Sequence, residues 1–153
     1  MICYFDTSAL VKRYAQETGT TWVIKLTALE SGHDSYTVRI AGPELIAALF
    51  RKVRMQEITQ ADAERAAANF KADFRAQYQV IEITTGLADQ AMRLAEKHGL
   101  RGYDAVHLAA AVKLQTVRVE MELPPMIFVS ADDELNAAAQ EEGLSIDNPN
   151  THI

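Results

Sequence analysis

The sequence predicts an α/β fold: a three-layer α/β/α sandwich with a mainly parallel central sheet of four to five strands. Short apolar runs alternate with helical patterns along the whole chain, and this alternation is typical of parallel strands connected by helices. No repeat, low-complexity tract or linker interrupts the pattern, and 153 residues are enough to bury a core. We therefore expect a single domain over residues 1–153.

The first expected strand is followed by two expected helices. Residues 2–5 form a short apolar run, which is typical of a strand buried on both faces. Apolar residues at helical spacing follow from Ser8, and Gly19 marks the end of this pattern. A second helical pattern begins at Thr20 and ends before Gly32.

The second expected strand covers residues 34–40 and is also followed by two helices. Gly42-Pro43 opens the first of them, because proline is favoured in the first turn of a helix. Thr59 begins a long alanine-rich helix that runs towards Gln77. The Asp three residues after Thr59 suits a reciprocal cap at the helix start.

The remainder of the chain is expected to contain two more strands, three helices and a last edge strand. In chain order these are strand 79–83, helices 85–98 and 103–117, strand 126–129, a helix from Asp132 or Asp133 to about Glu142, and an edge strand at 145–146. Gly99 and Pro124-Pro125 separate them, because glycine ends helices and proline cannot continue one.

The charge of the chain argues against a protein that binds nucleic acid by simple attraction. Its 15 basic and 21 acidic residues give a net charge of −6, whereas such binders usually carry a positive surface. An enzyme whose acids hold cations remains compatible with this charge. Basic residues do gather at Arg51, Lys52 and Arg54, with others at Lys12-Arg13, Arg39 and Arg101. The ordinary interpretation of each is a solvated helix face.

Several features favour a cytoplasmic protein. The single cysteine, Cys3, can form no internal disulfide and lies in a strand-like run, so we expect a small buried apolar residue. No apolar run approaches the roughly 18 residues that would span a bilayer. The N-terminus lacks the basic and apolar regions of a secretion signal.

Four carboxylates occupy equivalent positions in the expected fold. Asp6 and Asp132 directly follow strands, and Glu44 and Asp104 lie in the first turns of helices. An acid at any one of these positions is explained by its favourable interaction with the helix dipole, which stabilises the helix by about 0.3–1 kcal/mol. In open parallel sheets, however, ligands bind beyond the carboxyl ends of the strands. The four acids together therefore predict one shared site.

The chemistry of such a site favours a divalent cation. Two like charges about 5 Å apart repel by roughly 3 kcal/mol at an effective dielectric constant near 20, so a cluster of four requires protons or metals. Carboxylate oxygens suit Mg²⁺ or Mn²⁺, which lower the pKa of water and stabilise a phosphate during cleavage. Ser8 and Ser130 lie two residues from Asp6 and Asp132. They are expected to support the acids, contact a phosphate or cap helices.

The chain contains the three stretches DTSALVKRYAQETGT, LRGYDAVHLAAA and FVSADDEL. Together they resemble the PIN-domain family, in particular the VapC-type toxins of bacterial toxin–antitoxin pairs. The resemblance covers nearly the whole chain, with the motifs in the family order. It implies a PIN-like fold and a Mg²⁺- or Mn²⁺-dependent endoribonuclease that cleaves single-stranded regions of RNA. The family's conserved catalytic and metal-binding acids would correspond to Asp6, Glu44, Asp104 and Asp132. A homodimer and a small antitoxin partner are also implied, and the family spacing leaves Asp133 as a helix-start acid.

Other residues near these motifs allow two interpretations. His107 lies one turn after Asp104 and is either a metal or base residue or a hydrogen-bonded packing residue. Arg101 and Tyr103 flank the same motif and either contact RNA or serve as a surface charge and a packing ring. No pair of histidines has the spacing of a zinc site.

Two other function classes remain open from the sequence. A PIN-like domain without activity would bind RNA or a protein partner through the same fold. A phosphatase with an aspartyl nucleophile at Asp6 would need a second Asp two residues later, and this chain has Ser8 there.

Overall fold

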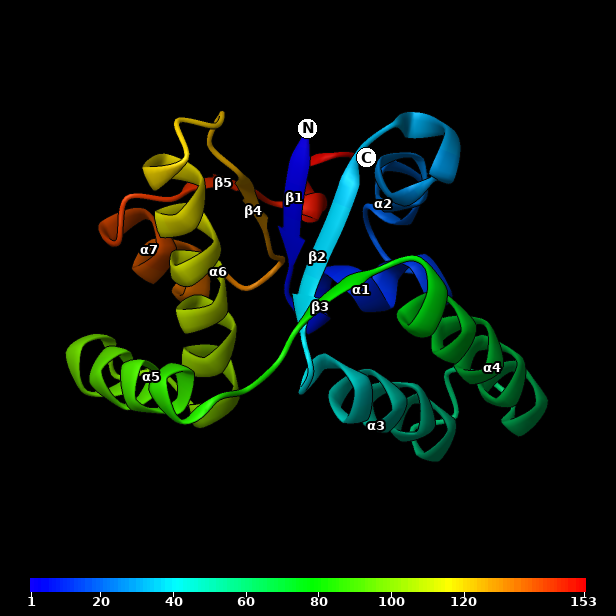
Figure 1. Ribbon diagram of the computed structural model, residues 1–153. Helices are drawn as coiled ribbons and strands as arrows, with labels where there is room; N and C mark the ends of the chain where they lie inside the picture. The colour runs from blue at the N-terminus through cyan, green and yellow to red at the C-terminus, as the bar shows by residue number, and fades with distance from the viewer.

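The computed structural model describes residues 1–153 and contains one five-stranded sheet with the strand order β3-β2-β1-β4-β5 (Figure 1). All four neighbouring pairs of strands are parallel. The strands are β1 (Ile2–Phe5), β2 (Asp34–Val38), β3 (Gln79–Ile81), β4 (Ile127–Val129) and β5 (Ser145–Asp147). The prediction of an α/β sandwich with a parallel sheet is confirmed, including its last edge strand.

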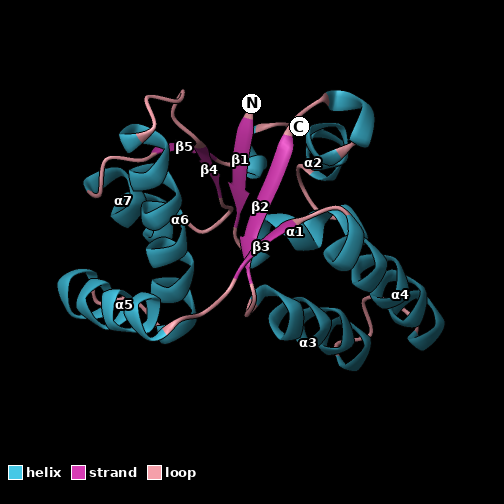
Figure 2. Ribbon diagram, in the orientation of Figure 1, coloured by secondary structure: helices cyan, strands magenta, loops and turns pink.

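Seven α-helices connect and cover the strands (Figure 2). They are α1 (Thr7–Tyr14), α2 (Thr20–Thr27), α3 (Ala41–Arg54), α4 (Gln60–Ala76), α5 (Thr85–His98), α6 (Gly102–Glu120) and α7 (Asp133–Glu141). Two short 3₁₀ helices, η1 (Leu29–Ser31) and η2 (Pro149–Thr151), complete the structure, and η2 was not expected from the sequence. None of the helices combines the length and hydropathy that crossing a membrane would require.

The strands β2 and β3 are shorter than the expected ranges 34–40 and 79–83. Beyond their paired residues, one further hydrogen bond joins Arg39 N to Ile81 O at 3.0 Å. The next residue, Ile40, already has helical backbone angles of φ −64° and ψ −20°. Because α3 begins there, before Gly42-Pro43, no further strand pairing is possible.

The sheet separates two apolar cores, because successive side chains of a strand point to opposite faces. Cys3 and Phe5 of β1 belong to the core that contains residues of α1, α2, α3 and α4. Tyr4, between them, belongs to the core that contains residues of α5, α6 and α7. All three side chains are fully buried, as expected for a central strand covered on both faces.

The topology places a crevice beyond the carboxyl ends of β1 and β4. The chain passes from β1 outwards to β2 and β3, whereas β4 and β5 extend the sheet on the other side of β1. The strand order therefore reverses between β1 and β4, where ligands of open α/β sheets bind. Asp6 and Asp132, the residues that cap α1 and α7, lie at this edge, and each accepts a hydrogen bond from the first turn of its helix.

Candidate active site

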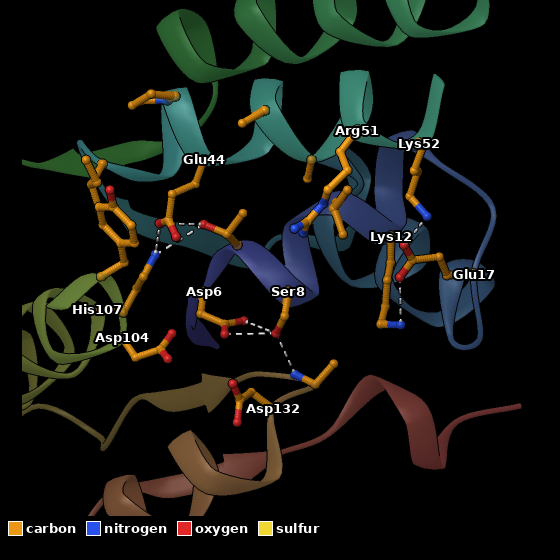
Figure 3. A pocket seen from close by; sticks show the side chains of 18 of the residues that line it. Asp6, Ser8, Lys12, Glu17, Glu44, Arg51, Lys52, Asp104, His107 and Asp132 are labelled. Atoms are coloured by element: carbon orange, nitrogen blue, oxygen red, sulfur yellow. Dashed lines mark hydrogen bonds and ion pairs between the residues drawn. The ribbon is translucent and has the colours of Figure 1, made fainter. Parts of the chain in front are cut away.

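A cavity of about 1180 Å³ lies at this edge of the sheet (Figure 3). The four carboxylates selected from the sequence, Asp6, Glu44, Asp104 and Asp132, all line it. They come from the end of β1, from the first turns of α3 and α6, and from the start of α7. Residues almost 130 positions apart are thus brought together, as the carboxyl-edge rule predicts.

Asp6 is the most firmly held of the four. Its Oδ1 accepts hydrogen bonds from the Ser8 hydroxyl at 2.7 Å and from Ala9 N at 3.0 Å. Its Oδ2 accepts from Ser8 at 2.8 Å and from the Ser130 hydroxyl at 2.8 Å. Burial raises the pKa of Asp6, while the nearby His107 and these hydrogen bonds lower it. The hydrogen bonds from Ser8, Ala9 and Ser130 fix the side chain in one orientation at the floor of the cavity.

Ser8 and Ser130 serve this arrangement in different ways. Ser8 lines the cavity, and its oxygen also accepts a hydrogen bond from Ala131 N at 3.0 Å, which ties α1 to the loop after β4. Ser130 is fully buried, and its oxygen accepts from Asp132 N at 3.1 Å. Because Ser130 is inaccessible, its position suits support of Asp6 rather than contact with a phosphate.

Glu44 is held through one oxygen only. Its Oε1 accepts hydrogen bonds from the Thr7 hydroxyl at 3.0 Å and from His107 Nε2 at 2.8 Å. His107 Nδ1 lies 2.9 Å from the hydroxyl of Tyr4, in the buried core. Since a carboxylate only accepts, Nε2 carries a proton and donates to Glu44, while Nδ1 and the Tyr4 hydroxyl share a second hydrogen bond. No protein group is hydrogen-bonded to Oε2 of Glu44.

This chain of contacts was not evident from the sequence. His107 was expected to be a metal or base residue or a packing residue, and it is buried between Tyr4 and Glu44. Burial raises the pKa of the Tyr4 hydroxyl, as do the charges of Asp6 and Glu44, so this hydroxyl keeps its proton and can donate. Thr7, directly after Asp6, was not selected at all. The only sequence signal was the three-residue spacing of Asp104 and His107.

Asp104 and Asp132 have fewer partners. Asp104 accepts no hydrogen bond from the protein, and its one ion-pair partner is Arg101, with Nε at 4.0 Å. Burial raises the pKa of Asp104, and the charge of Asp132 raises it further, against the opposing effects of His107 and Arg101. Asp132 accepts from Leu135 N through Oδ1. The adjacent Asp133 lies outside the cavity and accepts from Asn148.

The donor set suits a hard divalent cation, because all four groups are carboxylates and two of them repel each other. No three His, Cys, Asp or Glu side chains are already arranged to hold one ion. An ion bound here would therefore either keep several of its water ligands, as Mg²⁺ commonly does, or draw the carboxylates closer together. The unpartnered Asp104 has the freedom to move closer, since no hydrogen bond fixes it.

Arg101 and Tyr103 both line the cavity. The Tyr103 side chain is 60% exposed, which excludes a role as a packing ring in the core. Arg101 is also exposed, so both are available to a ligand.

The sequence matches the PIN-domain family profile over residues 3–141. It is 33% identical over 146 residues to ribonuclease VapC45 and, equally, to ribonuclease VapC49 of Mycobacterium tuberculosis. In both cases the alignment covers 95% of this chain and 94% of the relative.

The fold is similar to those of several solved structures. These include PAE2754 from Pyrobaculum aerophilum, with a TM-score of 0.64 and 20% identity, covering 99% of this chain and 91% of that one. VapBC2 from Rickettsia felis, bound to a promoter DNA fragment, gives a TM-score of 0.62 at 14% identity, covering 97% and 98%. FitAcB from Neisseria gonorrhoeae gives 0.62 at 15% identity, covering both chains fully. At these identities the likeness concerns the fold.

Proposed function

Because the chain belongs to the PIN-domain family, we propose that it is a ribonuclease, the toxin of a toxin–antitoxin pair, with Asp6, Glu44, Asp104 and Asp132 as its catalytic carboxylates. The observation that carries this proposal is the convergence of these four acids in one cavity at the switch point of the sheet. The ribonuclease activity of the Mycobacterium tuberculosis relatives, named as such, supports the reaction class.

The same four residues would hold Mg²⁺ or Mn²⁺. The cation would supply charge neutralisation at the scissile phosphate and a lower pKa for the attacking water. Asp6 is oriented for this by its hydrogen bonds from Ser8 and Ser130. Glu44 presents Oε2, because Thr7 and His107 occupy Oε1. Repulsion between Asp104 and Asp132 in the free protein favours any bound cation.

The substrate class is single-stranded RNA, cleaved within the strand. Hydrolysis adds water across the bond between phosphorus and the 3′ oxygen, which leaves a 5′-phosphate and a 3′-hydroxyl. The cavity is open and is lined on one side by the exposed Tyr103 and Arg101. An aromatic face and a guanidinium group are the residue types on which unpaired bases stack.

The Ser8 hydroxyl argues against the phosphatase alternative. It donates to both oxygens of Asp6, at 2.7 and 2.8 Å. An aspartyl nucleophile would need one of these oxygens to face a phosphorus atom, and the general acid expected two residues later is missing.

The test is cleavage of a mixed RNA pool by the purified protein with Mg²⁺, with Mn²⁺ and with a chelator. The proposal predicts cleavage that requires the metal and products with 5′-phosphates. Asp104→Asn should reduce the rate by about 10²-fold or more, because an amide cannot replace the charge that binds the cation.

Asp133→Asn is the matched control, since it changes the neighbouring acid outside the cavity and should cleave at the wild-type rate. Metal-independent cleavage, or equal rates for Asp104→Asn and Asp133→Asn, would refute the assignment of the site. A protein that binds RNA and never cleaves it would support the non-catalytic alternative.

The family also suggests partners and a compartment. We propose that the protein acts in the cytoplasm as a homodimer and is held inactive by a small antitoxin protein. Two of the similar structures are VapBC2 from Rickettsia felis and FitAcB from Neisseria gonorrhoeae. A gene for a small DNA-binding protein directly upstream, whose product co-purifies with this chain and blocks cleavage, is the expected finding. An isolated gene would contradict the toxin–antitoxin assignment while leaving the ribonuclease assignment intact.

A further inference from the structure

The cavity has a second end whose charge is opposite to that of the carboxylate end. Four cationic side chains line it: Lys12, Arg51, Lys52 and Arg54. We call this set the basic arm. It lies on α1 and α3, the helices that also carry Ser8 and Glu44 (Figure 3). In a chain with a net charge of −6, a local excess of cations inside the main cavity requires a cause.

One face of α3 connects the two ends. Glu44, Ala47, Ala48 and Arg51 line the cavity with the spacing of a single helix face. Arg51 lies seven residues after Glu44, which corresponds to about 10 Å along the helix axis. The two alanines between them leave the cavity open along this path. An extended ligand that contacts the carboxylates can therefore follow α3 to Arg51.

The two lysines of the basic arm are held in place by shared carboxylates. Glu17 pairs with Lys12 Nζ at 3.2 Å through Oε1 and with Lys52 Nζ at 2.8 Å through Oε2. Glu57 pairs with Lys52 at 3.3 Å. Lys12 is only 4% exposed, so its ammonium group is fixed at the cavity wall. These contacts fix the positions of the two lysines, and the charges of Glu17 and Glu57 balance theirs.

Arg51 differs from both lysines, because its guanidinium group has no ion pair and no hydrogen bond within the protein. Figure 3 shows it extending from α3 into the cavity, between the carboxylate end and Lys12. A basic residue in the last turn of a helix is stabilised by the helix dipole. The dipole accounts for a cation at this turn, but not for a guanidinium group that projects into the same cavity as a buried lysine.

We propose that Arg51, which projects beside the fixed Lys12 and Lys52, binds a backbone phosphate of the RNA strand on one side of the scissile phosphate. The proposal rests on the proposed function and adds a subsite to it. Guanidinium groups bind phosphate oxygens through paired hydrogen bonds, and Arg51 has all its donors available. The contact is to the backbone and is therefore independent of the base sequence.

The experiment measures binding in a chelator, so that cleavage does not interfere. The probe is a short fluorescein-labelled oligouridylate, titrated with the full-length protein over a series of NaCl concentrations. Arg51→Gln is expected to weaken binding by about tenfold or more, the value of one charge-assisted contact. The slope of log K against log salt should fall in magnitude by about 0.7, the value for one phosphate contact on a single strand.

Arg93→Gln is the matched control. It removes the same charge from an exposed arginine of α5 that bonds only Gln90 and lies outside the cavity. It should leave both the affinity and the salt slope unchanged. A further variant, Glu17→Gln, removes the negative charge that pairs with two lysines of the basic arm, and it should tighten RNA binding. Under cleavage conditions, Arg51→Gln should raise KM with little change in kcat.

A neutral methylphosphonate linkage, moved one position at a time along the probe, locates the contact. Wild-type binding should weaken most at one position away from the cut, and Arg51→Gln should be insensitive there. Equal affinity and salt slope for Arg51→Gln and Arg93→Gln would overturn the subsite, even if the protein cleaves RNA. Absence of RNA binding by the wild type at low salt would also overturn it. Binding that depends on Arg51, without any cleavage, would uphold the subsite and refute the proposed function.

Discussion

Replacing Tyr4 with phenylalanine tests the buried contacts behind Glu44. The ring of Tyr4 stacks on Phe128, with centroids 5.6 Å apart and an interplanar angle of 11°, and phenylalanine keeps this packing. The substitution removes only the hydroxyl that lies 2.9 Å from His107 Nδ1. Both residues are buried, with exposures of 0% and 1%. Water therefore cannot replace the lost hydroxyl without a local rearrangement.

The magnitude follows from this burial. An unsatisfied buried donor or acceptor costs about 1–3 kcal/mol. In a domain of this size, each kcal/mol lowers the melting temperature by about 2–4 °C. We therefore expect Tyr4→Phe to lower the free energy of unfolding by about 1–3 kcal/mol, measured by urea denaturation followed by circular dichroism. The cleavage rate should fall as well, because His107 is the residue that donates to Glu44.

Tyr36→Phe supplies the control, since Tyr36 lies on the neighbouring strand β2 and its hydroxyl makes no hydrogen bond with the protein. Its stability should change by no more than about 0.5 kcal/mol. The reasoning would be refuted if the two variants lost equal stability, because the hydroxyl of Tyr4 would then have no special partner.

Three further predictions concern single residues. His107→Gln keeps a donor for Glu44 and should retain more cleavage than His107→Leu, with both rates measured at a temperature at which both variants are folded; equal rates would show that the hydrogen bond is irrelevant. Ionisation of Asp104 opposes folding in the absence of metal, because folding raises the pKa of this carboxyl above the ordinary 3.8. In a chelator at neutral pH, the melting temperature of Asp104→Asn should therefore exceed that of the wild type. The difference should vanish as the pH falls below 3.8, where the wild-type carboxyl is protonated in both states. Gly19→Ala should lower the free energy of unfolding by more than about 1 kcal/mol, because the residue has φ +86° and its new Cβ would lie 2.2 Å from Pro149 O. A urea denaturation curve identical to that of the wild type would contradict this.

The elements that the sequence predicted well have local causes. Residues 2–5 are apolar because they are buried on both faces, and this leaves a continuous apolar run in the sequence. The cap at Thr59 was predicted from one residue pair, and both of its hydrogen bonds are present, with Asp62 as the partner. Local signals of this kind determine where helices begin. Because ligands of parallel sheets bind at the carboxyl ends of the strands, the shared location of the four acids could then be predicted without any known distances.

Features that depend on distant residues could not be predicted in the same way. The contact between Tyr4 and His107 joins residues 103 positions apart, and neither residue type requires the other. The short length of β2 was equally hidden, because Ile40 is an apolar, β-branched residue that adopts helical angles in this fold. The orientation of Arg51 into the cavity depends on which face of α3 packs on the core, and a basic cluster alone leaves that face undetermined.

The hydrogen bonds are unevenly distributed among the four carboxylates, and this has a mechanical consequence. Asp6 accepts from three protein groups, Glu44 accepts through one oxygen, and Asp104 accepts none. The protein's own donors thus stabilise the deepest charge, so the chain can fold before any cation binds. The remaining repulsion is concentrated on Asp104 and Asp132, which are both only partly buried. A cation that binds here relieves this repulsion, and the relief adds to its affinity. The same distribution predicts that Asp104→Asn will both stabilise the free protein and lower its cleavage rate by about 10²-fold or more.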